Sequence, residues 1–276
     1  MAKVFTNKSI FSHESLRKCQ MAFTSFHFLI TSITLWIMSR PCLGGFVAKS
    51  IPPHRILHLA GLMCAQIVLQ NISLAYSSVI FHQLVRLLLT PITALSNFLL
   101  YQATIPKASI MPLVIMCSGV GIVFYYDTVT TAAGGETTSP TGAFAAIVGV
   151  CSSALYTTLV GRYHKKFDVT SMQLLLNQSS LGTGLLLCSV PFFDTLPSMN
   201  ALSGRLYTSL LLSGLCAFLV NLSQFYVIEA SGPVSSTVVG HFKTCMIIGL
   251  GWMVSGHSTM SQSIAGVFMA LVGMSW

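Results

Sequence analysis

Two basic residues lie deep inside apolar runs of this 276-residue sequence. Lys243 stands near the middle of the run from Pro233 to Gly256, and Arg86 stands inside the run from Ser78 to Tyr101. A central lysine costs a membrane span about 2.5 to 3.5 kcal/mol, so it usually faces a protein-lined cavity and pairs with an anion. No Asp or Glu lies inside a predicted span, apart from Glu229 at the end of one. We therefore expect the counter-ion of both cations to be a ligand.

Arg86 has polar neighbours at helical spacing. His82 precedes it by four residues, Gln83 by three, and Thr90 follows it by four. Residues three and four apart share one side of a helix, so this face is predicted to line a cavity and to bind the ligand. The alternative is that Arg86 reaches an interface with its long side chain, but its position eight residues after Ser78 argues against that.

Lys243 also has neighbours suited to a binding site. His241 and Thr244 are polar residues beside it, and Gly240 leaves space one turn earlier. Amides in other runs add to the candidate site, although intramembrane amides also hold helices together. The candidate amides are Gln70, Asn71, Asn177 and Asn221.

Composition places these residues in a membrane protein. The chain is 53% hydrophobic and only 7% charged, whereas a soluble domain has about 25% charged residues. A membrane helix needs about 17 or more apolar residues, and nine runs qualify or come close. The predicted fold is therefore an all-α polytopic membrane protein with spans at 21–38, 56–76, 78–101, 110–126, 142–160, 171–193, 206–228, 233–256 and 261–276.

The net charge of +8 indicates topology rather than nucleic-acid binding, because the basic residues are scattered through short loops. By the positive-inside rule, three loops on one side are predicted to face the cytosol. Their basic residues are Arg40, Lys49, Arg55, Lys107, Arg162, Lys165 and Lys166. The basic N-terminal segment, residues 1–20, would then lie on the opposite side, against this tendency.

The two halves of the chain resemble each other weakly. When Arg86 is superposed on Lys243, similar apolar runs, polar turns and glycine-containing spans follow in both halves. Such internal symmetry is typical of transporters built from inverted repeats. The predicted division is a first repeat at 1–126, a polar non-cytosolic loop at 127–140 and a second repeat at 141–276.

Catalysis finds little support in the sequence. No nucleophile elbow or P-loop is present, and the six acidic residues lie mostly in loops. The eight cysteines are dispersed and have no C-x-x-C metal spacing. We expect no enzyme activity, no catalytic residue, no metal and no cofactor.

Three segments together resemble a known family. They are Asn71 to Pro91, the G-H-F-K-T box at Gly240 to Thr244, and the terminal A-G-V-F-M-A-L-V-G-M-S-W. They are similar to the triose-phosphate and nucleotide-sugar transporter branch of the drug/metabolite transporter superfamily. The resemblance covers nearly the whole chain and implies ten helices in two inverted five-helix repeats.

The resemblance also implies an antiport mechanism in a Golgi or ER membrane. Its binding cations correspond here to Lys243, Arg86 and Lys8, the last within Thr6-Asn7-Lys8. The Lys243-Thr244 pair is similar to the nucleotide-sugar group, whereas plastid sugar-phosphate exchangers carry Lys-Arg. The GALNK box of GDP-mannose carriers is absent, which disfavours that substrate.

The most favoured function is exchange of a nucleotide sugar for a nucleoside monophosphate across a lipid bilayer. A sugar-phosphate, small organic-anion or secondary-metabolite transporter is an alternative, and so is a shortened membrane protein that does not transport. Ahead of Asn7 stand only six residues where the family has its first helix, so we expect that helix to be largely missing and the last one to be short. A homodimer is also compatible with the sequence.

Overall fold

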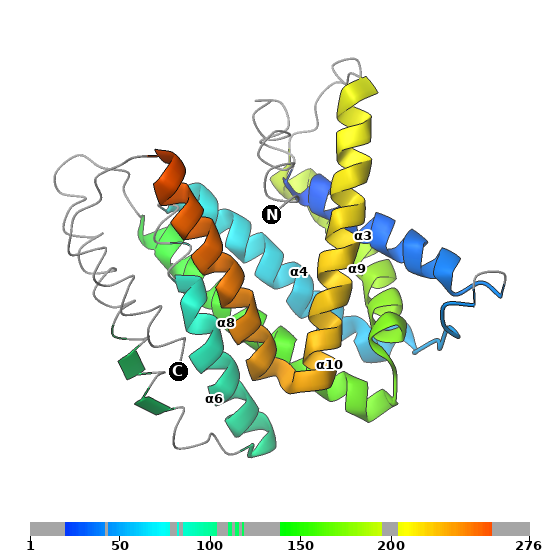
Figure 1. Ribbon diagram of the computed structural model, residues 1–276, viewed down its shortest axis with the longest axis horizontal. Helices are drawn as coiled ribbons and strands as arrows, with labels where there is room; N and C mark the ends of the chain where they lie inside the picture. The colour runs from blue at the N-terminus through cyan, green and yellow to red at the C-terminus, as the bar shows by residue number, and fades with distance from the viewer. Residues whose placement is uncertain are drawn as a thin grey trace. The chain divides into compact units, whose positions relative to one another are not determined.

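The structure is a computed structural model of the chain. It describes residues 20–41, 44–77, 82, 85–103, 110–111, 114–115, 118, 139–194 and 204–255. Every regular element in these ranges is helical, which confirms the predicted all-α fold. Figure 1 shows the helices α3 (Gln20–Met38), α4 (Pro53–Tyr76), α6 (Leu89–Tyr101), α8 (Pro140–Phe167), α9 (Ser171–Phe193) and α10 (Gly204–Ser255); a short 3₁₀ turn, η1 (Arg86–Leu88), precedes α6.

Most helix bounds agree with the predicted spans to within a few residues. Among the C-terminal ends, the largest difference is that of α8, which continues seven residues past the predicted end at 160 and reaches Phe167. Its last turn carries His164, Lys165 and Lys166, and basic groups are favourable at the negative end of a helix dipole. The predicted span ends at 160 because several of the residues that follow are charged or polar. The helix itself continues beyond the apolar stretch.

The helix α10 contains two predicted spans in one continuous element of 52 residues. Gly232 separates them with φ 86° and ψ 171°, values outside the helical region. Only glycine adopts this backbone conformation readily, and the following Pro233 disfavours a helical conformation in the residue before it. The pair therefore ends one helix and starts the next without a loop, as the predicted spans 206–228 and 233–256 require.

Four helical stretches among the described residues are long and apolar enough to cross a bilayer. They are Met21–Met38, Pro53–Ser73, Pro140–Phe167 and Thr208–Gly240. The protein is therefore an integral membrane protein. The count of nine spans stays a prediction, because 104–109 and 119–138 and the last predicted span, 261–276, lie outside the described residues.

The chain forms two compact units. Unit 1 comprises residues 1–64 and 160–230, and unit 2 comprises residues 65–159 and 231–276. Each unit combines segments from both predicted repeats. The boundaries fall inside α4, inside α8 and beside the break at Gly232.

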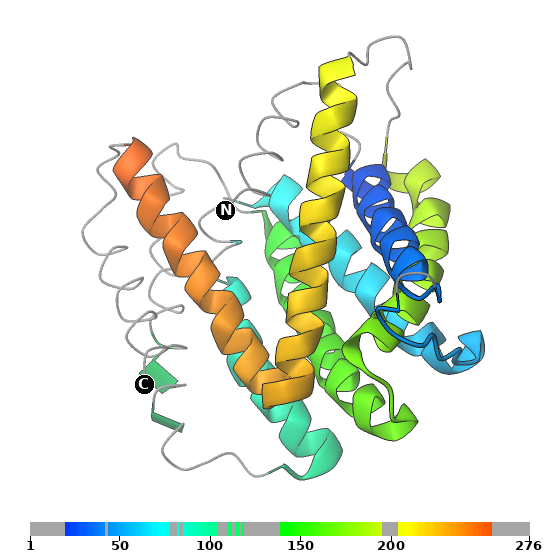
Figure 2. The ribbon, with the colours of Figure 1, turned by 45° about the vertical axis from the view of Figure 1, so that its right-hand side comes forward.

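In unit 1, α3 packs along α9 (Figures 1 and 2). Close approach of these helices and their neighbours depends on small residues, as is usual between membrane helices. A Cβ on Gly182 would lie 2.4 Å from Met63 Cε, and one on Gly214 would lie 3.0 Å from Ile30 Cγ1. The core also contains completely buried leucines from three helices: Leu35, Leu59, Leu174 and Leu175.

In unit 2, the second half of α4 packs against the first half of α8. A Cβ on Gly142 would lie 2.3 Å from the carbonyl oxygen of Tyr76, so only glycine fits there. About two turns further along, a Cβ on Gly149 would lie 3.2 Å from Leu69 Cβ and 3.5 Å from the backbone nitrogen of Gln70, a looser contact. Val85, Ala146 and Val150 form a buried apolar cluster beside this contact.

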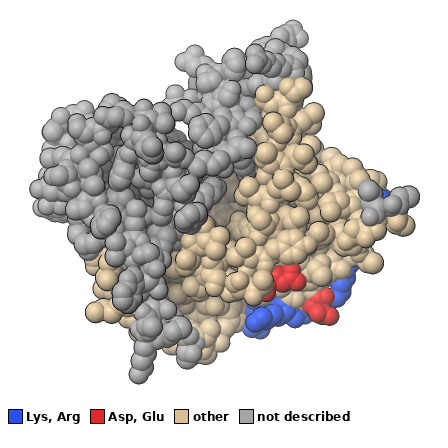
Figure 3. All heavy atoms as spheres, in the orientation of Figure 1, with Lys and Arg blue, Asp and Glu red and all other residues tan. Residues whose placement is uncertain are grey.

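Charged residues gather at one end of unit 1, along the lower edge of the face in Figure 3. Lys49 Nζ donates hydrogen bonds to the carbonyl oxygens of Phe167 (2.8 Å) and Asp168 (2.9 Å). The Tyr163 hydroxyl donates to the carbonyl of Arg55 at 3.0 Å. The loop after α3 and the loop after α8 therefore lie at the same end, as their basic residues predicted; Lys107 of the remaining loop lies outside the described residues.

Candidate functional site

Lys243 lies within a helix. Lys243 lies ten residues after Pro233 in the second half of α10, which remains helical to Ser255. This places its backbone near the middle of the helical segment from Pro233 to Ser255. The same segment contains His241 and Thr244, whereas Lys8 and Gln83 lie outside the described residues.

Arg86 begins the short 3₁₀ turn η1 that leads directly into α6. Val85 before it and Leu89 after it both have right-handed helical backbone angles, so the chain stays helical through the tighter turn. A 3₁₀ turn within a longer helical path often marks a functional position. Leu87 is completely buried, while the Arg86 side chain is exposed.

One hydrogen bond joins the Arg86 segment to the Lys243 helix. Thr90 Oγ1 donates to Thr237 Oγ1 at 3.0 Å, and both hydroxyls are buried. Thr237 also donates to the carbonyl of Val234 at 2.7 Å, within its own helix. The two predicted cation-bearing segments are therefore neighbours within unit 2.

The two segments are antiparallel in both views of the ribbon: α6 runs toward Tyr101 while the second half of α10 runs the opposite way (Figures 1 and 2). Arg86 precedes Thr90, and Lys243 follows Thr237, so both positions lie on the same side of the hydrogen bond. Helical rise puts them about 7 Å and about 9 Å from it along the two axes. Positions 86 and 243 are therefore at nearly the same level.

His82 is turned toward α4. Its Nδ1 lies 3.1 Å from Ser73 Oγ, and both side chains are buried. Ser77, half-buried in the next turn, donates to the carbonyl of Ser73 at 2.6 Å. His82 thus anchors the start of the Arg86 segment to the end of α4.

The candidate amides are divided between the two units. Gln70 and Asn71 are half-buried on the second half of α4 in unit 2, with Arg86 and Lys243. Asn177 and Asn221 are half-buried on α9 and on the first half of α10 in unit 1. The structure thus places the four amides in two groups.

Asn177 is engaged by the protein itself. Its Nδ2 donates to the carbonyl oxygens of Lys49 and Gln173, each at 2.8 Å, and its Oδ1 accepts from the backbone N–H of Ile51 at 3.0 Å. An asparagine amide has two hydrogens to donate, and here both are used. In this structure Asn177 holds the segment between α3 and α4 against α9.

Metal binding has no support in the part of the chain that the structure describes. No group of three or more His, Cys, Asp or Glu side chains there could hold a metal ion. The cysteines at positions 64, 151, 188 and 216 are free thiols.

No family model matches the chain. Sequence comparison nevertheless finds similar transporters from Arabidopsis thaliana. UDP-xylose transporter 1 is 30% identical over 91% of this chain and 72% of that protein. UDP-rhamnose/UDP-galactose transporter 1 is 30% identical over 91% of this chain and 71% of that protein. This chain belongs to the nucleotide-sugar transporter family.

The fold of this family member is also found in a solved protein. The structural match to that protein's crystal structure spans 99% of this chain and 94% of the other chain. The TM-score is 0.63 and the sequence identity is 14%. The relatives are named as transporters and not as enzymes, in agreement with the expected absence of enzyme activity.

Two contacts of this nucleotide-sugar transporter family member were missed by the sequence analysis. Thr237 lies in the polar segment that begins the run from Pro233, and this local polarity could have predicted a contact with another helix. Ser73 gave no signal, because nothing in its spacing links it to His82. Both are buried hydroxyls with a partner on another segment.

Proposed function

We propose that this protein carries a nucleotide sugar across a Golgi or ER membrane in exchange for a nucleoside monophosphate. The observation that carries the proposal is the hydrogen bond between Thr90 and Thr237, which joins the segments of Arg86 and Lys243. With both positions at a similar level, two cations can approach one diphosphate. Membership of the family supports nucleotide sugar as the substrate class.

The charge balance of unit 2 supports an anionic ligand. Its described residues include Arg86 and Lys243 but no Asp or Glu. The Arg86 side chain is exposed. A guanidinium in an apolar span needs an anionic partner, and we assign that part to the ligand.

The relatives support a uracil nucleotide as the carrier half of the substrate. Six of the similar Arabidopsis proteins are named as transporters of UDP-xylose or of UDP-rhamnose and UDP-galactose. UMP suits the exchange chemically: a glycosyltransferase that uses the UDP-sugar releases UDP, and hydrolysis of UDP to UMP and phosphate leaves a monophosphate that must return across the membrane. Asn71 and Gln70, in the same unit as the cations, are the amides we assign to the base or sugar.

Reconstituted exchange tests the proposal. Purified protein in liposomes preloaded with UMP, GMP, CMP, inorganic phosphate or buffer is given radiolabelled UDP-xylose, UDP-galactose, GDP-mannose or a triose phosphate. We expect uptake of a UDP-sugar that internal UMP stimulates about tenfold over buffer. Uptake of a triose phosphate stimulated by internal phosphate, with no response to any nucleotide, would instead establish the sugar-phosphate alternative.

A tagged copy in the cells of origin tests the compartment. Co-localisation with a Golgi or ER marker is the expected result. A plastid or plasma-membrane signal would contradict it.

A further inference from the structure

Helices α3 and α9 come from different halves of the sequence, yet they are joined at several levels along their lengths. At the start of α3, the Asp194 carboxylate at the end of α9 accepts the backbone N–H groups of Met21 (3.2 Å) and Ala22 (2.6 Å). Free N–H groups at a helix start need such a partner, and a carboxylate is favourable at that end of the dipole.

In the middle of the pair, hydroxyl groups connect the two helices. Ser25 Oγ donates to the carbonyl oxygen of Thr183 at 3.3 Å, and Ser32 Oγ lies 2.7 Å from Ser180 Oγ. Within a membrane, hydrogen bonds between helices supply much of the attraction that the hydrophobic effect supplies in water.

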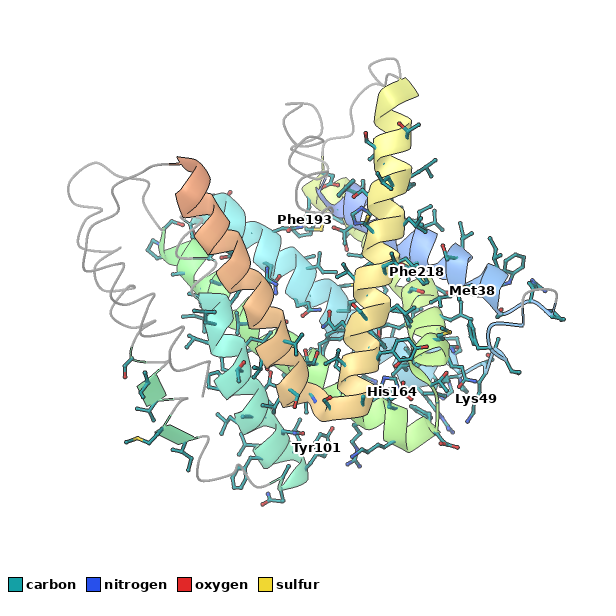
Figure 4. The ribbon with its side chains drawn as sticks, viewed as in Figure 1. Met38, Lys49, Tyr101, His164, Phe193 and Phe218 are labelled. Carbon is teal, nitrogen blue, oxygen red and sulfur yellow. The ribbon has the colours of Figure 1, made fainter. Side chains whose placement is uncertain are left out.

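At the charged end, the segment from 44 to 52 forms a strap that passes from α3 to α4 across the start of α9. Gln173 Nε2 donates to the carbonyl of Val47 at 2.8 Å. Asn177 holds the carbonyl of Lys49 and the N–H of Ile51. The Lys49 side chain donates to the carbonyl oxygens of Phe167 and Asp168, at the end of α8. Figure 4 labels Lys49 at this end and Phe193 at the opposite end of α9.

The first half of α10 completes this assembly. His27 Nε2 of α3 lies 3.1 Å from Ser213 Oγ, and Gly214 permits close contact with Ile30. The Glu229 carboxylate, three residues before Gly232, accepts hydrogen bonds from the backbone N–H (2.9 Å) and the hydroxyl of Ser171. Each of the three helices therefore has polar contacts with the other two.

We propose that α3, α9 and the first half of α10 move as one rigid body during transport, so that the moving parts are not the two sequence repeats. If the repeats moved against each other, the contacts between α3 and α9, including that between Ser32 and Ser180, would break and re-form in each cycle. Here the contacts at both ends exist together in one conformation, as expected of a body that does not open. The inference rests on the proposed function, because only a transporter must alternate.

A reversible cross-link between the two repeats distinguishes the two mechanisms. Ser32→Cys with Ser180→Cys puts two thiols where two hydroxyls face each other, and copper phenanthroline oxidises them to a disulfide. We expect the oxidised protein to transport at no less than half the rate of the reduced protein. A tenfold or greater loss on oxidation, reversed by dithiothreitol, would overturn the rigid body. Each single variant, oxidised in the same way, controls for the natural cysteines.

The same experiment separates this inference from the proposed function. If the reduced double variant and the wild type both fail to take up any nucleotide sugar, the proposed function fails. The rigid body is then tested by electron–electron double resonance between spin labels at Ile33→Cys and Leu187→Cys, two exposed positions on α3 and α9. One narrow distance in bilayers, unchanged by UMP, supports the rigid body, whereas two populations contradict it.

Discussion

Two regions of this apolar protein contain polar side chains: the contact between α3 and α9, and the segment that carries Arg86. The two regions differ in the partners of these side chains. Along α3 and α9, serine, asparagine and aspartate side chains find partners on a neighbouring helix or strap. Around Arg86, the hydroxyls of Thr90 and Thr237 are joined to each other, while no carboxylate is present among the described residues of that unit.

The difference separates two reasons for placing polar residues in a membrane. Groups paired within the protein stabilise helix packing, whereas cations with no carboxylate among the described residues of their unit are suited to an anionic ligand. Variants in the first region should therefore change stability with little effect on the chemistry of transport. Variants in the second should change transport with little effect on stability.

The largest effect is expected from Lys243→Met. We predict a loss of uptake of at least about 100-fold in proteoliposomes, with a yield of folded protein near that of wild type. A lysine near the middle of a membrane span costs about 2.5 to 3.5 kcal/mol, so its removal should not destabilise the unliganded fold. Lys166→Met removes the same charge at the exposed end of α8 and should transport normally. Uptake by the Lys243 variant at the wild-type rate would remove this residue from the site.

A smaller effect is expected from Arg86→Gln, combined with the first variant in a double-mutant cycle. We predict that UMP binding weakens about tenfold to 100-fold in the single variant. The double variant should lose less than the sum of the two single losses, since groups that hold one anion depart from additivity by about 0.5 to 3 kcal/mol. Isothermal titration of each protein gives the four free energies. Strictly additive losses would place the two cations at separate sites.

In the α3–α9 region, Asp194→Asn should lower stability while transport per folded molecule is retained. The substitution weakens the acceptor for two N–H groups at the start of α3, and loss of a helix cap costs about 0.5 to 2 kcal/mol. Thermal unfolding in detergent measures the change. Asp168→Asn is the matched control, because Asp168 is exposed and its φ of 47° suits asparagine as well. An equal shift in both variants would contradict the role of Asp194.

A pair of glycines two residues apart on α9 tests packing in the same region without changing any polar group. Gly184→Ala meets no atom within 4 Å and should stabilise the helix by up to about 1 kcal/mol. Gly182→Ala places a Cβ 2.4 Å from Met63 Cε, and overpacking of a buried site costs about 1 to 3 kcal/mol. Gly182→Ala should therefore unfold at a lower temperature than Gly184→Ala. The reverse order would mean that Met63 moves aside freely.

The sequence determined the class of the protein and the positions of most helices. Apolar runs of sufficient length predicted α3, α4, α6 with its preceding turn, α9 and both halves of α10, since hydropathy and length are the signals that a bilayer imposes. Loop charges also predicted that the loops after α3 and α8 share an end. The family membership was also predicted from the sequence.

Only the tertiary structure decided which polar residues hold the protein together. Asn177 and Arg86 look alike in the sequence, because each is a polar residue in an apolar run with other polar residues at helical spacing. Partners distant in the chain distinguish them: Asn177 meets residues 49 and 51, more than 120 positions away, and Thr90 beside Arg86 meets Thr237, 147 positions away. Helical periodicity gives the face on which a side chain lies, but the neighbour of that face is set by packing across the whole chain.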